Sequence, residues 1–398
     1  MRARLLLWIA LLLSAGCSTV ERVSDWFTSD ETSDPPAPLV EFSQRLKVIK
    51  LWDRGTGGGT EEQYLKLAPI VANQRLYIAD FDGDLTAMDA TNGTKLWSEN
   101  VAEKKGFWSR DEGYRITGGP GYGEKTILLG TNKGNVIALS ADTGKELWNT
   151  TVTSEVLSAP RRLAGTVVVR TIDGKMFALD GDTGRRLWIY ERSVPTLTLR
   201  GTSSPVISDN VVICGFDEGR LIAVELRTGK LIWEVRITTA RGSSELDRMV
   251  DIDSDPVVVN GVIYVATYQG HFAAVQLENG RIIWNRDLSS YAGFSVDNDN
   301  VYVTDENSHI LAFDRFSGTP LWEQKKLHAR KITAPSVIGN YLVVGDYDGY
   351  LHWMSKDSGN FVARNRVSDE AIIAPPLVVG KILYAFSSDG ELAAYTYR

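Results

Sequence analysis

The sequence contains few of the residue types that most often build catalytic or metal sites. Its 398 residues include two cysteines, Cys17 and Cys214, and four widely separated histidines without the spacing of metal ligands. A Gly-x-Ser-x-Gly nucleophile motif is absent. The acidic stretch 251–255 continues with Pro256, where a calcium-binding loop requires glycine. We therefore expect no catalytic residue, no metal and no cofactor, and we expect Cys214, in an apolar run, to be a small buried side chain.

Positive charge is also scarce. The chain has 43 lysines and arginines against 50 aspartates and glutamates, which gives a net charge of −7. Proteins that bind nucleic acids concentrate positive charge, and so do proteins that dock on anionic lipid headgroups. The composition argues against both kinds of binding through a basic face.

The N-terminus has the pattern of an export signal. Arg2 and Arg4 precede the apolar run 5–13, which is too short to cross a hydrocarbon core of ~30 Å as a helix. Small residues at 14–16 then lead to Cys17. This arrangement resembles the lipobox of bacterial lipoproteins. The resemblance implies that residues 1–16 are a signal peptide and that lipid, palmitate included, is attached to Cys17.

The same resemblance bears on location. Ser18 stands where some bacterial lipoproteins carry an aspartate that retains them in the inner membrane. The resemblance therefore implies a lipid anchor in the outer membrane, at its periplasmic face. An ordinary secreted protein, cleaved after Ala15 or Gly16, is the alternative.

After a tether at residues 17–43, rich in Ser, Thr, Asp, Glu and Pro, residues 44–398 repeat one unit. Five copies begin with proline and end with tryptophan: Pro69–Trp97, Pro120–Trp148, Pro160–Trp188, Pro205–Trp233 and Pro256–Trp284. A sixth, Phe294–Trp322, lacks the proline, and a seventh, Pro335–Phe361, ends on phenylalanine. An eighth begins at Pro375 and stops at Arg398 before its last segment, which occurs at the other end of the chain as Leu46–Trp52.

The content of the unit predicts an all-β fold, an eight-bladed β-propeller of four-stranded antiparallel blades. Each unit has four short β-rich runs separated by turn residues, such as Asp-Gly at 173–174 and Thr-Gly at 183–184. The split eighth unit predicts that the N-terminal strand closes the ring. We expect each repeated tryptophan to lie on an outer strand and pack between blades. The outer edges could pair with an extended client strand, and bulges or caps on every outer strand would count against this hypothesis.

The segment Ala178–Trp188 reads Ala-Leu-Asp-Gly-Asp-Thr-Gly-Arg-Arg-Leu-Trp and resembles the repeat of quinoprotein (PQQ) propellers. The repeat occurs in enzymes and in non-enzymes, so a quinoprotein dehydrogenase is one alternative. Such enzymes usually carry an adjacent cysteine pair and calcium ligands, and this sequence has no adjacent cysteines. A periplasmic sensor or ligand-binding propeller, with aromatic residues lining its channel, is a second alternative because fold alone does not fix function.

The combination of lipobox, polar tether and eight repeats resembles the BamB (YfgL) family, lipoproteins of the machinery that folds β-barrel proteins into the outer membrane. Two segments, 197–201 and 247–253, resemble that family's segments for binding BamA, the central barrel subunit. The resemblance implies a non-enzymatic scaffold that binds the periplasmic repeats of this subunit and aids the folding of unfolded outer-membrane proteins. The residues that it implies for partner binding are Leu197, Leu199, Arg200, Asp251 and Asp253.

Spacing supports this grouping. Arg200 lies five residues before Pro205, and Asp251 lies five residues before Pro256, so both occupy equivalent positions on loops of consecutive blades. Apolar residues beside an arginine and two carboxylates have the composition of an interface anchor with a charged rim. An internal ion pair between Arg200 and Asp251 is the alternative. Two longer loops, 98–119 and 234–255, are further candidates for binding.

Overall fold

The computed structural model describes residues 34–60, 65, 67–102, 113–192, 203–239 and 250–398. The chain divides into two compact units, Met1–Ala37 and Pro38–Arg398. All regular elements of the described residues are β-strands, and they lie in the second unit. Within the described ranges, no helix has the length and apolar character needed to cross a membrane.

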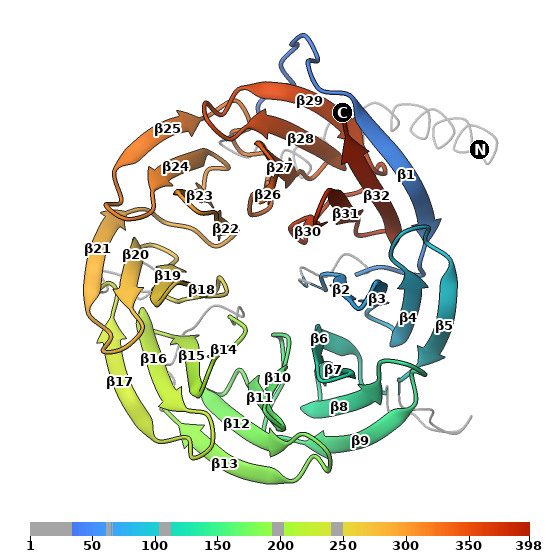
Figure 1. Ribbon diagram of the computed structural model, residues 1–398, viewed down its shortest axis with the longest axis vertical. Helices are drawn as coiled ribbons and strands as arrows, with labels where there is room; N and C mark the ends of the chain where they lie inside the picture. The colour runs from blue at the N-terminus through green and yellow to red at the C-terminus, as the bar shows by residue number, and fades with distance from the viewer. Residues whose placement is uncertain (1–33, 61–64, 66, 103–112, 193–202, 240–249) are drawn as a thin grey trace, which may run out of the picture. The chain divides into compact units, whose positions relative to one another are not determined.

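The second unit is an eight-bladed β-propeller of four-stranded antiparallel sheets, which confirms the predicted fold (Figure 1). In blades one to seven the strands follow one another from the channel to the rim. Blade one comprises β2 (Ile70–Ala72), β3 (Arg75–Ala79), β4 (Asp84–Asp89) and β5 (Lys95–Asn100). Blade two comprises β6 (Ile116–Gly123), β7 (Thr126–Thr131), β8 (Asn135–Ser140) and β9 (Glu146–Thr151). Blade three comprises β10 (Arg161–Leu163), β11 (Thr166–Arg170), β12 (Lys175–Asp180) and β13 (Arg186–Glu191).

The remaining blades repeat this order. Blade four comprises β14 (Val206–Ser208), β15 (Val211–Phe216), β16 (Arg220–Glu225) and β17 (Leu231–Arg236). Blade five comprises β18 (Val257–Val259), β19 (Val262–Ala266), β20 (His271–Gln276) and β21 (Ile282–Asp287). Blade six comprises β22 (Gly293–Val296), β23 (Asn300–Thr304), β24 (Ile310–Asp314) and β25 (Pro320–Gln324). Blade seven comprises β26 (Ser336–Ile338), β27 (Tyr341–Gly345), β28 (Tyr350–Ser355) and β29 (Phe361–Arg366).

Blade eight combines the two ends of the described chain, as the split repeat predicted. Its inner strands are β30 (Leu377–Val379), β31 (Ile382–Phe386) and β32 (Glu391–Tyr397), and its outer strand is β1 (Val48–Gly55). β1 runs antiparallel to β32, with Val48 opposite Tyr397 and Gly55 opposite Glu391. This pairing closes the ring and leaves no open edge between the first and last blades.

The core lies in the middle strands of the blades. Val167, Val168 and Val169 on β11 are all buried, because both faces of each sheet pack against neighbouring blades. Cys214 on β15 is fully buried, as predicted. Burial raises the pKa of its thiol to about 11.

The repeated tryptophans join neighbouring blades, as predicted. Trp233 on β17 donates its indole N–H to the carbonyl of Leu277 in blade five, at 2.8 Å. Its ring lies against Gly280, which has φ +74°, and a Cβ there would come within 2.7 Å of a ring carbon. This turn therefore needs glycine for its backbone and for the space that the indole takes. The same glycine–tryptophan contact recurs at Gly93, Gly144, Gly184, Gly229, Gly318 and Gly359.

Blade seven departs from the predicted repeat. Ala363, and not Phe361, occupies the tryptophan position: Ala363 lies opposite Trp353, as Trp233 lies opposite Ala223, whereas Phe361 lies opposite Met354. The neighbour of blade seven, blade eight, has no turn between its third and outer strands, because β32 and β1 come from opposite ends of the chain. The segment before β1 covers the site instead: Phe42 stacks on Phe361 with ring centroids 5.4 Å apart, and the Arg364 guanidinium lies 5.1 Å from the Phe42 ring. The backbone N–H of Arg45 donates to the Val362 carbonyl at 2.8 Å.

Every outer strand is bulged. In all eight blades the register between the third and outer strands shifts by one residue. In seven blades the extra residue of the outer strand comes just before the repeated tryptophan, as Ile232 does before Trp233, and in blade seven it is Val362, just before Ala363. A bulge twists the strand and interrupts its ladder of backbone groups. This arrangement counts against the hypothesis that client strands pair with the blade edges.

Candidate functional site

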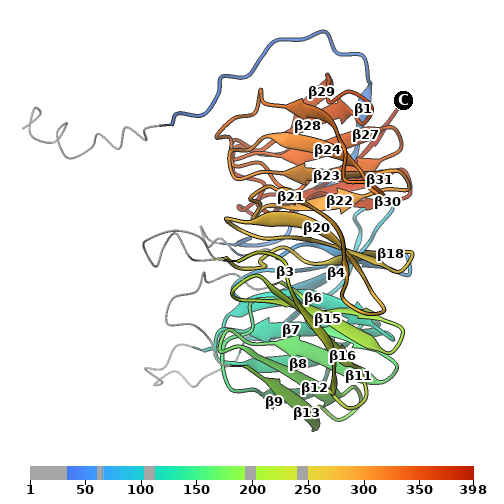
Figure 2. The same cartoon turned by 90° about the vertical axis from the view of Figure 1, so that its left-hand side faces the viewer.

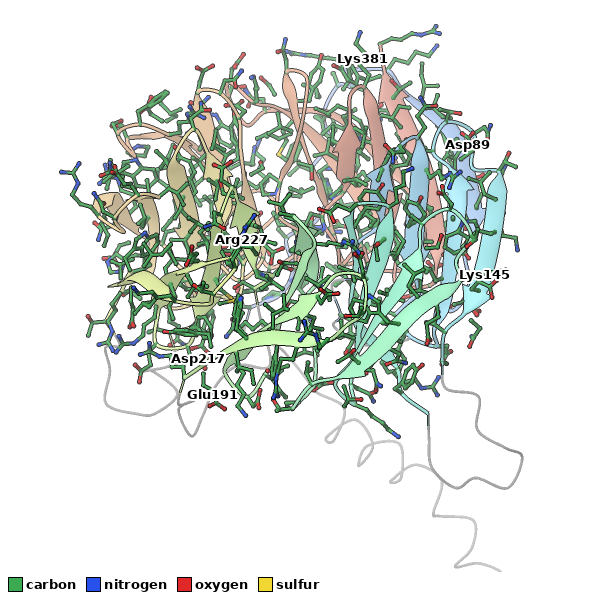
Figure 3. All side chains as sticks on the ribbon, turned by 60° about the horizontal axis from the view of Figure 1, so that its bottom comes forward. Asp89, Lys145, Glu191, Asp217, Arg227 and Lys381 are labelled. Carbon is green, nitrogen blue, oxygen red and sulfur yellow. The ribbon has the colours of Figure 1, made fainter. Side chains whose placement is uncertain are left out.

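The described end of the loop that carries Asp251 and Asp253 belongs to one face of the propeller. Because strands alternate in direction, hairpins between second and third strands and loops between blades emerge on this face, and the other turns emerge on the opposite one (Figure 2). Asp217, on the hairpin between β15 and β16, lies near Glu191 at the lower side of the ring in Figure 3, far from Lys381. We call this the hairpin face.

Asp251 and Asp253 lie on this face, in the loop between β17 and β18. Asp251 is 4% exposed, its backbone carbonyl accepts the Tyr268 N–H at 2.9 Å, and its carboxylate accepts the Glu218 N–H at 3.3 Å. The carbonyl bond recurs in other blades, for example from Ile172 to Glu155. The Asp251 backbone therefore follows the repeat, whereas its side chain binds the hairpin of blade four.

The other predicted residues, Leu197, Leu199 and Arg200, lie outside the described residues. Their side-chain positions, and the alternative ion pair between Arg200 and Asp251, stay predictions. Residues 103–112 and 240–249 of the two long loops also lie outside the described ranges. The described part of the first loop includes Tyr114 as a buried side chain.

The hairpin between β15 and β16 carries charged residues that the sequence analysis did not identify. Arg170, at the end of β11 in blade three, approaches Asp217 at 3.4 Å, and its guanidinium carbon lies 4.6 Å from the centroid of the Phe216 ring. The side chains of Arg170 and Asp217 are 3% and 14% exposed. Burial raises the pKa of Asp217, Arg170 opposes the shift, and the carboxylates of Asp251 and Glu218 add to it.

A chain of ion pairs continues from this hairpin along the outer strand of blade four. Glu218 binds Arg236 at 3.0 Å and Arg220 at 3.2 Å, and Arg220 also pairs with Glu234. Glu234 in turn binds Arg192, the last described residue before the loop with Leu197 and Arg200, at 3.0 Å. Burial opposes ionisation of Glu234, but the hydrogen bonds from Arg220 and Arg192 outweigh it and hold its pKa below the ordinary value.

Asp253 reaches the central channel, where a cavity of about 410 Å³ is lined by residues that precede or begin the inner strands. Asp255 lines the same wall, accepting the Ser204 N–H at 2.6 Å and facing Arg161 at 3.5 Å. Phe294 is the one aromatic side chain among the described residues that line this cavity. This lining gives little support to the alternative of a ligand-binding propeller whose channel is lined with aromatic residues.

Among the described residues no group of three or more His, Cys, Asp or Glu side chains could hold a metal ion. His352 and Asp346, which are fully buried in blade seven, form an internal network. His352 donates from Nε2 to Asp346 at 2.8 Å and accepts at Nδ1 from Arg364 at 3.2 Å. Both ring nitrogens of the neutral imidazole thus have a hydrogen-bond partner, and burial lowers the pKa of His352.

Comparison with known proteins assigns the chain to a family. A family model described as outer membrane protein assembly factor BamB matches residues 82–324 and 306–398. The outer membrane protein assembly factors BamB of Salmonella typhimurium and Escherichia coli are 39% and 38% identical to the chain, each over 98% of this chain and 97% of the relative. The crystal structure of BamB from Moraxella catarrhalis is 29% identical and superposes with a TM-score of 0.77 over 88% of this chain and 100% of that chain.

Quinoprotein enzymes share the fold at lower similarity. A europium-containing methanol dehydrogenase superposes with a TM-score of 0.69 at 13% identity, over 88% of this chain and 93% of that chain. Such a likeness shows a common propeller architecture and carries no function with it. Since the family model matches residues 82–398 and the relatives match 98% of the chain, this protein belongs to the family of outer membrane protein assembly factor BamB.

Proposed function

We propose that this protein is a non-enzymatic scaffold of the complex that assembles β-barrel proteins in the outer membrane, and that it binds the central barrel subunit through the hairpin face. The relatives named outer membrane protein assembly factor match this chain over nearly their full length. The observation that supports the site is the position of Asp251, whose carboxylate binds the hairpin of blade four beside Arg170 and Asp217.

In this proposal the partner surface comprises Leu197, Leu199, Arg200, Asp251 and Asp253, and it recognises the periplasmic repeats of the barrel subunit. The leucines would be the apolar anchor, and the arginine and carboxylates would select the partner's charges. Unfolded outer-membrane proteins are the proposed clients of the assembled complex. The bulged outer strands make the hairpin face, rather than the blade edges, the preferred site for such contacts.

The proposed organisation is a signal peptide at residues 1–16, a lipidated tether at 17–43 and the propeller at 44–398. Lipid on Cys17 would hold the chain at the periplasmic face of the outer membrane. One acyl chain gives marginal binding, so firm anchoring needs more than one chain. Replacing Cys17 with serine should release the protein from outer-membrane fractions and abolish incorporation of labelled palmitate. Retention of Cys17→Ser in the membrane without label would contradict the anchor.

The partner assignment is tested by co-purification. We expect a tagged chain, extracted gently from the outer membrane, to bring down a large barrel protein with periplasmic repeats. Arg200→Glu should reduce this recovery, because it reverses a charge at the proposed rim. Arg227→Glu is the matched control, since Arg227 is exposed on the turn between β16 and β17, on the opposite face.

Two results would contradict the proposal. Recovery of no barrel-assembly subunit by the unaltered chain would remove the scaffold function and favour the quinoprotein or sensor alternatives. Normal recovery with Arg200→Glu would show that the partner binds elsewhere. Unfolding of Arg200→Glu, monitored by circular dichroism, would instead favour the internal ion pair with Asp251.

A further inference from the structure

Two adjacent blades depart from the repeat at positions that meet on the hairpin face. Blade three has Arg170 at the end of its second strand, where the other blades have small or uncharged residues: Ala79, Gly130, Gly215, Ala266, Thr304, Gly345 and Phe386. Blade four has Phe216 at the start of its hairpin, where the other blades have Asp80, Thr131, Thr171, Thr267, Asp305, Asp346 and Ser387.

In the other blades, the polar residue at the position of Phe216 stabilises its own hairpin. In five blades its side-chain oxygen accepts the backbone N–H four residues later, as Asp305 accepts from His309 at 2.7 Å. A phenylalanine cannot accept this bond. Blade four therefore lacks the local bond that the repeat provides, and a contact with blade three takes its place.

That contact is the stacking of Arg170 on Phe216. The guanidinium carbon lies 4.6 Å from the ring centroid, within the range of a cation–π interaction, and Nη2 faces Asp217 at 3.4 Å. The Nε and Nη1 atoms of Arg170 make no hydrogen bond to any described residue, although the side chain is only 3% exposed. A buried cation with unused donors is costly for stability alone.

The hairpin held by Arg170 contacts the described end of the loop that carries Asp251. On one side, the Glu218 N–H donates to Asp251. On the other side, Glu218 continues through Arg220 and Glu234 to Arg192, where the loop containing Arg200 begins.

We propose that Arg170, Phe216 and Glu218 are positioning residues of the partner surface. They hold the described end of the loop that carries Asp251 in a fixed relation to the hairpin of blade four. The three residues act through this loop and not by direct contact with the barrel subunit. This inference rests on the proposed function, and it deepens that proposal by naming residues that position the binding segment with Asp251.

The experiment measures the affinity of the full chain for purified periplasmic repeats of the barrel subunit, beside the unfolding midpoint of each variant. Arg170→Met removes the charge that holds the hairpin, and we expect binding to weaken about tenfold. Arg170→Lys should recover part of this loss, because it restores a charge beside Asp217. Glu218→Gln keeps its backbone N–H but loses its ion pairs, and we expect a loss of about threefold.

Asp348→Asn is the matched control. Asp348 occupies the position of Glu218 in blade seven, where it binds the buried Arg330 at 2.7 Å on the same face but far from the proposed surface (Figure 1). Its removal should lower the unfolding midpoint and leave the affinity unchanged. A purely structural role of Arg170 and Glu218 predicts this same pattern for their variants.

The outcomes separate the two proposals. If the unaltered chain does not bind the repeats, the proposed function fails. If the unaltered chain binds and Arg200→Glu weakens binding, the proposed function stands. If folded Arg170→Met and Glu218→Gln then bind as tightly as the unaltered chain, only the positioning inference fails. Should Arg170→Met not fold, Glu218→Gln decides the question, since unchanged affinity of that variant overturns the inference and weaker affinity supports it.

Discussion

The contact between Trp233 and Gly280 predicts how strongly one blade depends on its neighbour. Trp233→Phe removes the indole N–H that donates to the Leu277 carbonyl at 2.8 Å and leaves a smaller ring in a site that is 9% exposed. The unsatisfied carbonyl costs about 1–2 kcal/mol. The lost ring atoms and the remaining cavity cost about as much again. We therefore expect a loss of about 2–4 kcal/mol in the free energy of unfolding.

The assay is equilibrium unfolding in urea followed by circular dichroism, with two further variants. Ile232→Ala is the control, because this neighbouring side chain is 47% exposed and its loss should change stability by less than about 0.5 kcal/mol. Gly280→Ala places a Cβ against the indole at a positive φ, which costs about 1–2 kcal/mol for the backbone alone.

Comparing the single and double variants distinguishes loss of the contact between Trp233 and Gly280 from backbone strain at Gly280. If the indole and the turn form one unit, the double variant Trp233→Phe with Gly280→Ala will cost less than the sum of the single variants. The smaller phenylalanine ring leaves space for the alanine methyl group. Additive costs, or a Trp233→Phe variant as stable as the unaltered chain, would refute this account of the blade interface.

Three further predictions concern the rest of the ring. Burial lowers the pKa of His352 in the folded chain, so the unfolded chain binds the extra proton and stability should fall as the pH is lowered from 7 through 6.5. His352→Gln should flatten this part of a stability-against-pH curve, and an unchanged slope would contradict the assignment. Phe42→Ala should lower stability by about 1–2 kcal/mol in urea unfolding, because it uncovers Phe361; no change would show that the segment before β1 contributes nothing. The Cys214 thiol should react with a thiol reagent only at the rate of unfolding, whereas fast labelling of the native chain would contradict its burial.

The repeat made the architecture predictable because each unit has the same pattern of strand and turn residues. Alternating β-rich runs, turn glycines and one aromatic residue per unit imply a blade, and a unit split between the chain ends implies ring closure. The role of Phe361 was less accessible. Its partner, Phe42, lies in a segment whose polar composition predicts only a tether, and the contact exists because β32 and β1 leave a turn unfilled.

The site was predictable in part for a different reason. The equivalent spacing of Arg200 and Asp251 before Pro205 and Pro256 identified loops of adjacent blades, and the structure places Asp251 on the hairpin face. The role of Arg170 was not identified, although a charged residue at the end of an otherwise apolar strand is a visible signal. Its stacking on a side chain of the next blade depends on packing between units, and the repeat pattern does not specify such contacts.

Site-specific photo-crosslinking in living cells tests the central claim most directly. A photoreactive amino acid at position 253, on the hairpin face, is compared with one at position 227, on the opposite face. The account predicts a crosslink from position 253 to the barrel subunit of the assembly complex and none from position 227. A crosslink to that subunit from position 227 alone would contradict the proposed docking face.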